Sequence, residues 1–180
     1  MRTNKITQSS LRAIIGWVVV LAFRLIPYRM PNIEGIMGTL MPVSKRFNYF
    51  GSFMYAFASI ILYDLITGTG GLWTFFTAPT YGAIGIWAVI YFRKKQATRG
   101  QFVLFSIYGT LVYDLITGVF GGPILFGQSF MGALIGQIPF TLYHLAGNIA
   151  IAALVSPIFL KYVVENTSLE FNTKLASVRN

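Results

Sequence analysis

Long apolar runs alternate with short polar stretches along the chain. About 20 consecutive apolar residues cross a bilayer as a helix, so five of the runs have the length of a span and one is short. No ten-residue alternation of a membrane barrel is present, and in lipid the backbone must be hydrogen-bonded within each segment. The pattern therefore predicts an all-α integral membrane protein with six transmembrane helices. The runs extend over residues 11–27, 33–43, 47–65, 72–92, 101–116 and 132–160.

Composition agrees with this pattern. Of the 180 residues, 55% are hydrophobic and only 11% are charged, which excludes a water-soluble domain with a wetted surface. The first apolar run contains Arg24 and lacks a small-residue cleavage site, which favours a retained helix over a signal peptide. Cysteine is absent, which removes thiolate metal ligands and cysteine nucleophiles. We therefore expect residues 1–180 to form a single transmembrane domain.

Basic residues indicate the topology. Of the 14 lysines and arginines, only Arg24 and Arg29 fall on one side of the predicted spans, provided that residues 33–43 cross the membrane. Cytoplasmic loops carry such an excess of positive charge. Both termini, the loop at residues 93–99 and a polar tail over residues 161–180 are therefore expected in the cytoplasm, with the chain in the cell membrane. The net charge of +9 does not indicate nucleic-acid binding, because the basic residues lie between apolar runs.

A repeated hexapeptide indicates an internal duplication. Tyr-Asp-Leu-Ile-Thr-Gly occurs at Tyr63–Gly68 and at Tyr113–Gly118, 50 positions apart, and glycine and phenylalanine positions further along match at the same offset. Each copy belongs to a predicted helical hairpin, over about residues 47–92 and 101–160. Two crossings per copy make the repeat parallel, unlike the inverted repeats of many transporters. The two aspartates are then expected at the same depth, near the external end of their spans.

Three acidic residues lie within or beside the predicted spans: Glu34, Asp64 and Asp114. An ionisable side chain in the bilayer costs roughly 2.5–3.5 kcal/mol on insertion scales, so such residues usually line a cavity or are paired. They are candidates for ligand binding. Alternatively, the two aspartates cap a chain reversal at each Thr-Gly, or pair with Arg24, without contacting a ligand. Arg24 itself either binds ligand or extends to the membrane interface.

The last predicted helix carries further candidates. His144 is the only histidine, Asn148 follows it by one helical turn and Gln137 precedes it by nearly two turns. These side chains either contact ligand or hydrogen-bond to neighbouring helices. Aromatic residues are a third group, although such residues also gather at membrane interfaces for solvation alone. The aromatic residues that could stack on a ring of the ligand are Tyr63, Trp73, Tyr81, Tyr113 and Phe130.

Several motifs of enzymes are missing from the sequence. There is no Gly-x-x-x-x-Gly-Lys-Ser/Thr loop, so the chain is not itself the ATPase of a pump. There is no His-Glu-x-x-His, no metal-spaced set of His and Cys, and no Gly-x-Ser-x-Gly. We therefore expect no enzymatic activity, cofactor or metal centre. The two Tyr-Asp motifs leave an intramembrane aspartyl protease as an alternative, but such proteases have glycine before the aspartate rather than after it.

Three stretches of this sequence carry a family resemblance. They are Arg24-Leu-Ile-Pro27 with Pro31-Asn-Ile-Glu34, the repeated Tyr-Asp-Leu-Ile-Thr-Gly, and Gly136-Gln-Ile-Pro-Phe-Thr-Leu-Tyr-His-Leu-Ala-Gly-Asn148. On them, and on its length and topology, the chain resembles the S components of energy-coupling-factor (ECF) transporters. These are small six-helix proteins that bind a vitamin or related micronutrient. The resemblance covers nearly the whole chain and adds Asn32, in the loop after the first helix, to the candidate site.

The resemblance implies partners and a cargo. S components work with a membrane T component and two ATP-binding-cassette ATPases, and they topple in the membrane to release the cargo inside. Members that take nickel or cobalt use an N-terminal histidine, which is absent here, so an organic micronutrient captured at the external face is expected. The carboxylates favour a ligand with several N–H donors or a positive charge, whereas Arg24 and Arg29 leave room for an acidic group. An autonomous membrane carrier or channel is the remaining alternative.

Overall fold

The computed structural model describes residues 2–28 and 33–169, and every regular element within them is a helix. The all-α prediction is confirmed. Four helical rods are long and apolar enough to cross a membrane, over Tyr49–Thr67, Leu72–Lys94, Arg99–Phe126 and Phe130–Val164, as suits a multi-pass membrane protein. The elements in chain order are α1 (Arg2–Arg24), α2 (Gly35–Ser44), α3 (Tyr49–Thr67), α4 (Leu72–Lys94), α5 (Arg99–Asp114), the π-helix η1 (Leu115–Phe120), α6 (Gly121–Phe126), α7 (Phe130–Phe159), the π-helix η2 (Leu160–Val164) and the 3-10 turn η3 (Thr167–Leu169).

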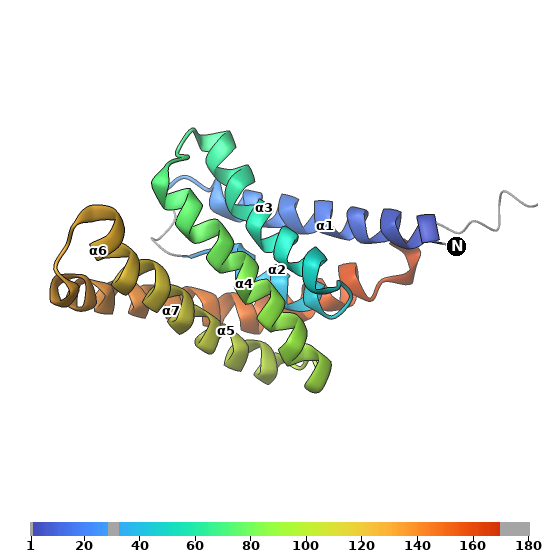
Figure 1. Ribbon diagram of the computed structural model, residues 1–180. Coiled ribbons are helices and arrows are strands. Elements are labelled where there is room, and N and C mark those ends of the chain that lie inside the picture. The colour runs from blue at the N-terminus through green and yellow to red at the C-terminus, as the bar shows by residue number, and fades with distance from the viewer. Residues whose placement is uncertain (1, 29–32, 170–180) are drawn as a thin grey trace, which may run out of the picture.

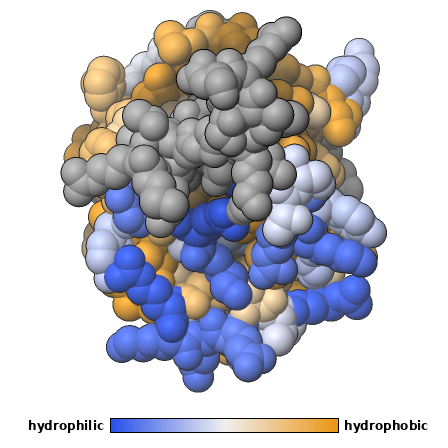
Figure 2. All heavy atoms as spheres, turned by 90° about the vertical axis from the view of Figure 1, so that its right-hand side faces the viewer, coloured by the Kyte–Doolittle hydropathy of each residue, from blue (hydrophilic) through white to orange (hydrophobic). Residues whose placement is uncertain are grey.

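Successive rods run in opposite directions (Figure 1). The chain reverses at residues 45–48 and 95–98 at the end of the bundle where the N-terminal helix begins, and at residues 68–71 and 127–129 at the opposite end. The lysine and arginine side chains at the first two reversals are exposed. Figure 2 views the molecule from this end and shows hydrophilic side chains gathered there. One end of the bundle is therefore basic, which agrees with the charge pattern of the sequence.

Local sequence explains where the long helices begin and end. The side chains of Asn48, Thr98 and Ser129 each accept a hydrogen bond from the backbone N–H three residues later, at the first turn of α3, α5 and α7. Gly68 and Gly127 end α3 and α6 in the left-handed conformation, with φ of 68° and 65°. These capping residues place the starts of α3, α5 and α7 within two residues of the expected runs, whereas Gly127 ends α6 ten residues beyond the expected end of its run at residue 116.

The short helix α2 forms the centre of the bundle. All ten of its residues are buried, and it packs against α1, α3, α4, α5 and α7. Its ten residues extend over about 15 Å, half of the roughly 30 Å of a hydrocarbon core. Gly38 permits the closest approach, because a side chain there would overlap Ile151 of α7, and Ser156 donates a hydrogen bond to the Gly38 carbonyl at 2.7 Å. Protein rather than lipid surrounds this run.

The two copies of the hexapeptide adopt different conformations. The first copy ends α3 at Gly68, where the chain turns back into α4. The second copy continues through η1 and α6 as far as Phe126, so its hairpin turns at Gly127, nine residues beyond the matching Gly118. A side chain at Gly118 would overlap the amide of Gln137 on α7, whereas nothing lies near Gly68. The close contact with α7 therefore takes the place of a left-handed cap, and the expectation of a reversal at each Thr-Gly is wrong for the second copy.

Candidate binding site

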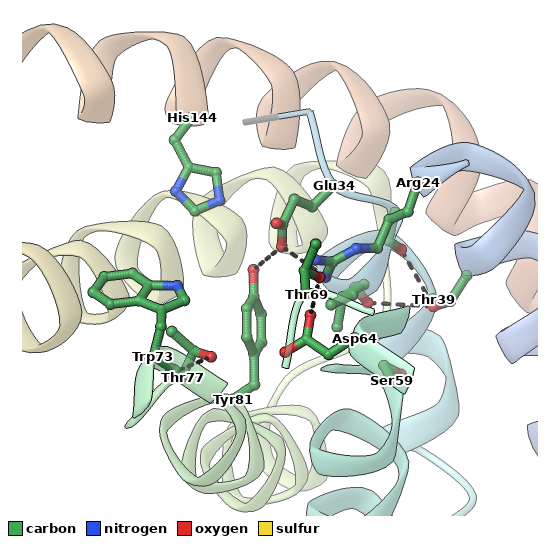
Figure 3. Close-up of polar contacts among 12 residues, drawn as sticks. Arg24, Glu34, Thr39, Ser59, Asp64, Thr69, Trp73, Thr77, Tyr81 and His144 are labelled. Carbon is green, nitrogen blue, oxygen red and sulfur yellow. Dashed lines mark hydrogen bonds and ion pairs between the residues drawn. The ribbon is translucent and has the colours of Figure 1, made fainter. Parts of the chain in front are cut away.

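A charged network joins the end of α1 to the start of α2 and to α4 (Figure 3). Arg24 lies 3.5 Å from Glu34, measured from Nη1 to Oε2, and its guanidinium lies over the Tyr63 ring at 3.9 Å from the centroid. Tyr81 donates a hydrogen bond from its hydroxyl to Glu34 Oε2 at 3.0 Å. The Arg24 side chain is only 8% exposed, so within the bundle its guanidinium is held by Glu34 and Tyr63.

A second polar set lies between α5 and α7. His144 Nδ1 is 2.8 Å from Asp114 Oδ1, and Asn148 donates from Nδ2 to Thr110 Oγ1 at 2.8 Å. Each of these four residues is at most 2% exposed. The two helices are antiparallel, so Asp114 follows Thr110 by four residues on α5 while His144 precedes Asn148 by four residues on α7. The two contacts are therefore one helical turn apart. The structure thus brings three predicted site residues together as two buried rungs between neighbouring helices.

Three atoms of these rungs have unused hydrogen-bonding capacity. Asp114 Oδ2, His144 Nε2 and Asn148 Oδ1 are buried and have no hydrogen-bond partner among the described residues. A buried polar group without a partner costs about 1–3 kcal/mol, and more when it is charged, so native proteins rarely keep several together. No three His, Asp or Glu side chains gather as metal ligands in the described part of the chain. The rungs therefore hold three buried atoms whose hydrogen bonds no described residue supplies.

Aromatic rings connect the two polar sets. Tyr81 and Tyr113 lie with ring centroids 4.3 Å apart, and Tyr113 meets the His144 imidazole edge-to-face at 5.8 Å. Phe140 contacts the same imidazole at 5.9 Å. Figure 3 shows His144 extending from α7 toward the hydroxyl end of Tyr81 and the carboxylate of Glu34. The aromatic rings therefore join the charged network and the rungs into one continuous set of contacts.

Asp64 has a different environment from Asp114. Thr69 and Thr74 both donate hydroxyl hydrogen bonds to the Asp64 carboxylate, and the Thr69 N–H donates to the Asp64 carbonyl at 3.1 Å. The residue therefore stabilises the turn between α3 and α4. Asp114 caps no turn, since its helix continues and its carboxylate pairs with His144. The two aspartates are also in separate networks, whereas an aspartyl protease needs two carboxylates close enough to share a proton.

Two other predicted site residues, Trp73 and Gln137, lie outside this region. Trp73 is 40% exposed and packs on Phe126 at 6.0 Å between ring centroids. Gln137 donates to Thr141 Oγ1 at 3.2 Å. It lines an open groove of about 530 Å³ along the start of α7, which reaches as far as Phe140. Asn32, like Arg29, lies outside the described residues.

Thr110 was not among the predicted site residues. Its signal in the sequence is the four-residue spacing to Asp114, which matches the spacing between His144 and Asn148 on the facing helix. Tyr81 was considered only as a stacking residue, and its bond to Glu34 depends on tertiary packing. Comparison of the chain with models of protein families, with curated proteins and with solved structures finds no match. The site's own geometry must therefore support any functional conclusion.

Proposed function

We propose that this chain is the substrate-capturing subunit of a small-molecule importer, of the kind that the resemblance to ECF S components implies. The observation that carries the proposal is the pair of buried rungs between α5 and α7. Asp114, His144 and Asn148 each keep one hydrogen-bonding atom that no described residue uses. Ionisable and polar groups inside a membrane bundle are costly to maintain, and such groups usually serve a binding or transport pathway. A bound polar molecule would satisfy all three atoms.

The proposed topology has six crossings, with α1 and the short α2 completing the four long rods. In this arrangement the basic end is cytoplasmic, as the excess of lysine and arginine favours. Asp114 follows Arg99 by 15 residues, about 22 Å along a helix from the basic end. In a hydrocarbon core of roughly 30 Å, this depth belongs to the outer half of the membrane. Cargo would then enter from outside, beside the Arg24–Glu34 connection.

The proposed partners are a membrane T component and ATP-binding-cassette ATPases in the cell membrane. The chain has no nucleotide-binding loop of its own, so energy for release would come from these partners. The cargo would be an organic micronutrient. An autonomous carrier is the alternative. The observation that favours it is the buried Asp114–His144 pair, because such pairs also serve as proton relays in pumps and transporters.

The test is whether the purified protein retains a small molecule from its host. We expect mass spectrometry of the denatured extract to detect one compound in nearly equimolar amount. Asp114→Ala and Asn148→Ala should weaken its binding roughly tenfold to a hundredfold, because each removes one partner of a buried polar contact. Asp64→Asn is the matched control, since Asp64 bonds to the α3–α4 turn, and this variant should retain the compound.

Two results would count against the proposal. If the parent protein retains no compound and none of the metabolites extracted from its host raises its melting temperature, the capture function is wrong. If the purified chain alone moves the compound across the membrane of sealed vesicles, the chain is an autonomous carrier. Co-purification with a T component and ATPases from native membranes would instead support the importer.

A further inference from the structure

The charged side chains of the candidate site leave an excess of negative charge, which affects the charge expected of the ligand. Arg24 and Glu34 form an ion pair and cancel each other. Asp64 lies apart, in hydrogen bonds to the α3–α4 turn. What remains at the rungs is the Asp114 carboxylate beside the His144 imidazole. With a neutral imidazole, the buried site between α5 and α7 carries one negative charge.

The unused atoms of the rungs are all hydrogen-bond acceptors in this state. An ionised Asp114 can only accept, so His144 donates from Nδ1–H and keeps a lone pair on Nε2. Asn148 donates to Thr110 from its amide nitrogen, which leaves its carbonyl oxygen Oδ1. Asp114 Oδ2 is the third acceptor. A molecule that satisfies this row must supply N–H or O–H donors rather than acceptors.

The surroundings also suit a planar cation. The faces of aromatic rings carry negative potential and attract cations within about 6 Å. Tyr113 and Phe140 both contact the His144 ring, and Tyr81 packs against Tyr113. The two rungs are about 6 Å apart along the helices, since four residues separate them. A flat ring with donors on two edges has dimensions that match this spacing.

From these observations we infer that the ligand is an organic monocation rich in N–H donors, such as an amidinium or a protonated amino-substituted heterocycle, and not a carboxylic acid or a phosphate ester. The inference rests on the proposed capture function and narrows its substrate class. Arg24 is compatible with this substrate class, because its guanidinium already pairs with Glu34 and lies over the ring of Tyr63.

The test compares three probes of the same shape: benzamidinium, benzamide and benzoate. They differ in charge and in the number of N–H donors, and each is added at millimolar concentration to the full-length protein in detergent while thermal unfolding is followed. We expect a dose-dependent rise in melting temperature with benzamidinium, a smaller rise with benzamide and none with benzoate. The net charge of +9 would by itself attract benzoate, so a preference for the cation must come from a local site.

Two variants locate the effect. Asp114→Asn removes the negative charge while keeping the shape and should abolish the benzamidinium shift, whereas Asp64→Asn should keep it. If Asp114→Asn does not fold, Asn148→Leu serves instead, because it removes one acceptor. This variant should need at least tenfold more benzamidinium for the same rise in melting temperature. Equal shifts with benzamidinium and benzoate, no shift with benzamidinium, or a shift that survives these variants would overturn the inference.

The compound released from the parent protein provides an independent measurement. A cation with at least three hydrogens that exchange in D₂O would support the inference. Release of a carboxylate or phosphate would overturn the substrate class while leaving the capture function intact. Failure to find any retained compound would count against the capture function, and the comparison of benzamidinium with benzoate would still decide the charge preference of the site.

Discussion

Variants of the Thr110–Asn148 contact should change the free energy of unfolding and the affinity for ligand to different extents. Thr110→Val removes the hydroxyl that accepts from Asn148 at 2.8 Å and leaves a buried N–H without its partner. Asn148→Leu removes the whole amide, including the acceptor Oδ1 that no described residue uses. The double variant replaces both partners with apolar groups of similar shape. Such a replacement is nearly neutral when the two groups interact only with each other.

The expected magnitude follows from the burial of the pair. Both side chains are at most 1% exposed, yet hydrogen bonds between membrane helices average only about 0.6 kcal/mol in double-mutant cycles and reach about 1.7 kcal/mol. We therefore expect a coupling free energy of about 0.6–1.7 kcal/mol, with the double variant more stable than the sum of the single changes. Binding of the retained compound should weaken less than about threefold in Thr110→Val and at least tenfold in both variants that contain Asn148→Leu.

The assay combines reversible denaturant unfolding in detergent with calorimetric titration of the four proteins. Strict additivity of the two stability changes would show that the two side chains do not interact as the structure indicates. Parent-like affinity in the folded double variant would show that Asn148 Oδ1 does not contact the ligand. The first result would contradict the Thr110–Asn148 hydrogen bond, and the second would exclude Asn148 from the binding site.

Three further predictions follow from packing and topology. Gly38→Ala should destabilise the protein by roughly 1–3 kcal/mol in denaturant unfolding, because its methyl group would overlap Ile151, whereas Gly136→Ala, which meets nothing within 4 Å, should not lower stability. Asp64→Ala should lower the melting temperature without changing ligand affinity, and a loss of affinity there would move Asp64 into the site. A single cysteine at Gln96 should resist an impermeant thiol reagent in intact cells while one at Thr69 reacts, and the reverse pattern would invert the proposed topology.

The sequence predicted the existence of the four long rods because it depends on local features. Asn48 begins α3 and Gly68 ends it, and hydrophobic length identifies the rods that could cross a membrane. The end of the third rod was not predicted, since it continues from the expected residue 116 to Phe126. The position of residues 35–44 was harder to predict. An apolar run of ten residues reads the same whether lipid or protein surrounds it, and only the contacts with α1, α3, α4, α5 and α7 make it the central helix.

The site was predicted in part for similar reasons. Asp114, His144 and Asn148 stand out because polar groups are rare in such spans, and the structure brings them together. The sequence could not distinguish Asp114 from Asp64, because both lie in the same hexapeptide. The surroundings of the two motifs differ, since Gln137 packs against Gly118 and has no counterpart at Gly68. Tertiary packing thus assigns different roles to identical local sequences.

The two hexapeptides also differ in what their aspartates contribute to the chain reversal that follows. In the first copy the carboxylate is engaged in holding the turn. In the second copy the reversal depends instead on Gly127 and the cap at Ser129, further along the chain. The Asp114 carboxylate bonds to His144 and not to that reversal. Displacing the reversal by nine residues therefore leaves an aspartate of identical local sequence directed into the interior of the bundle.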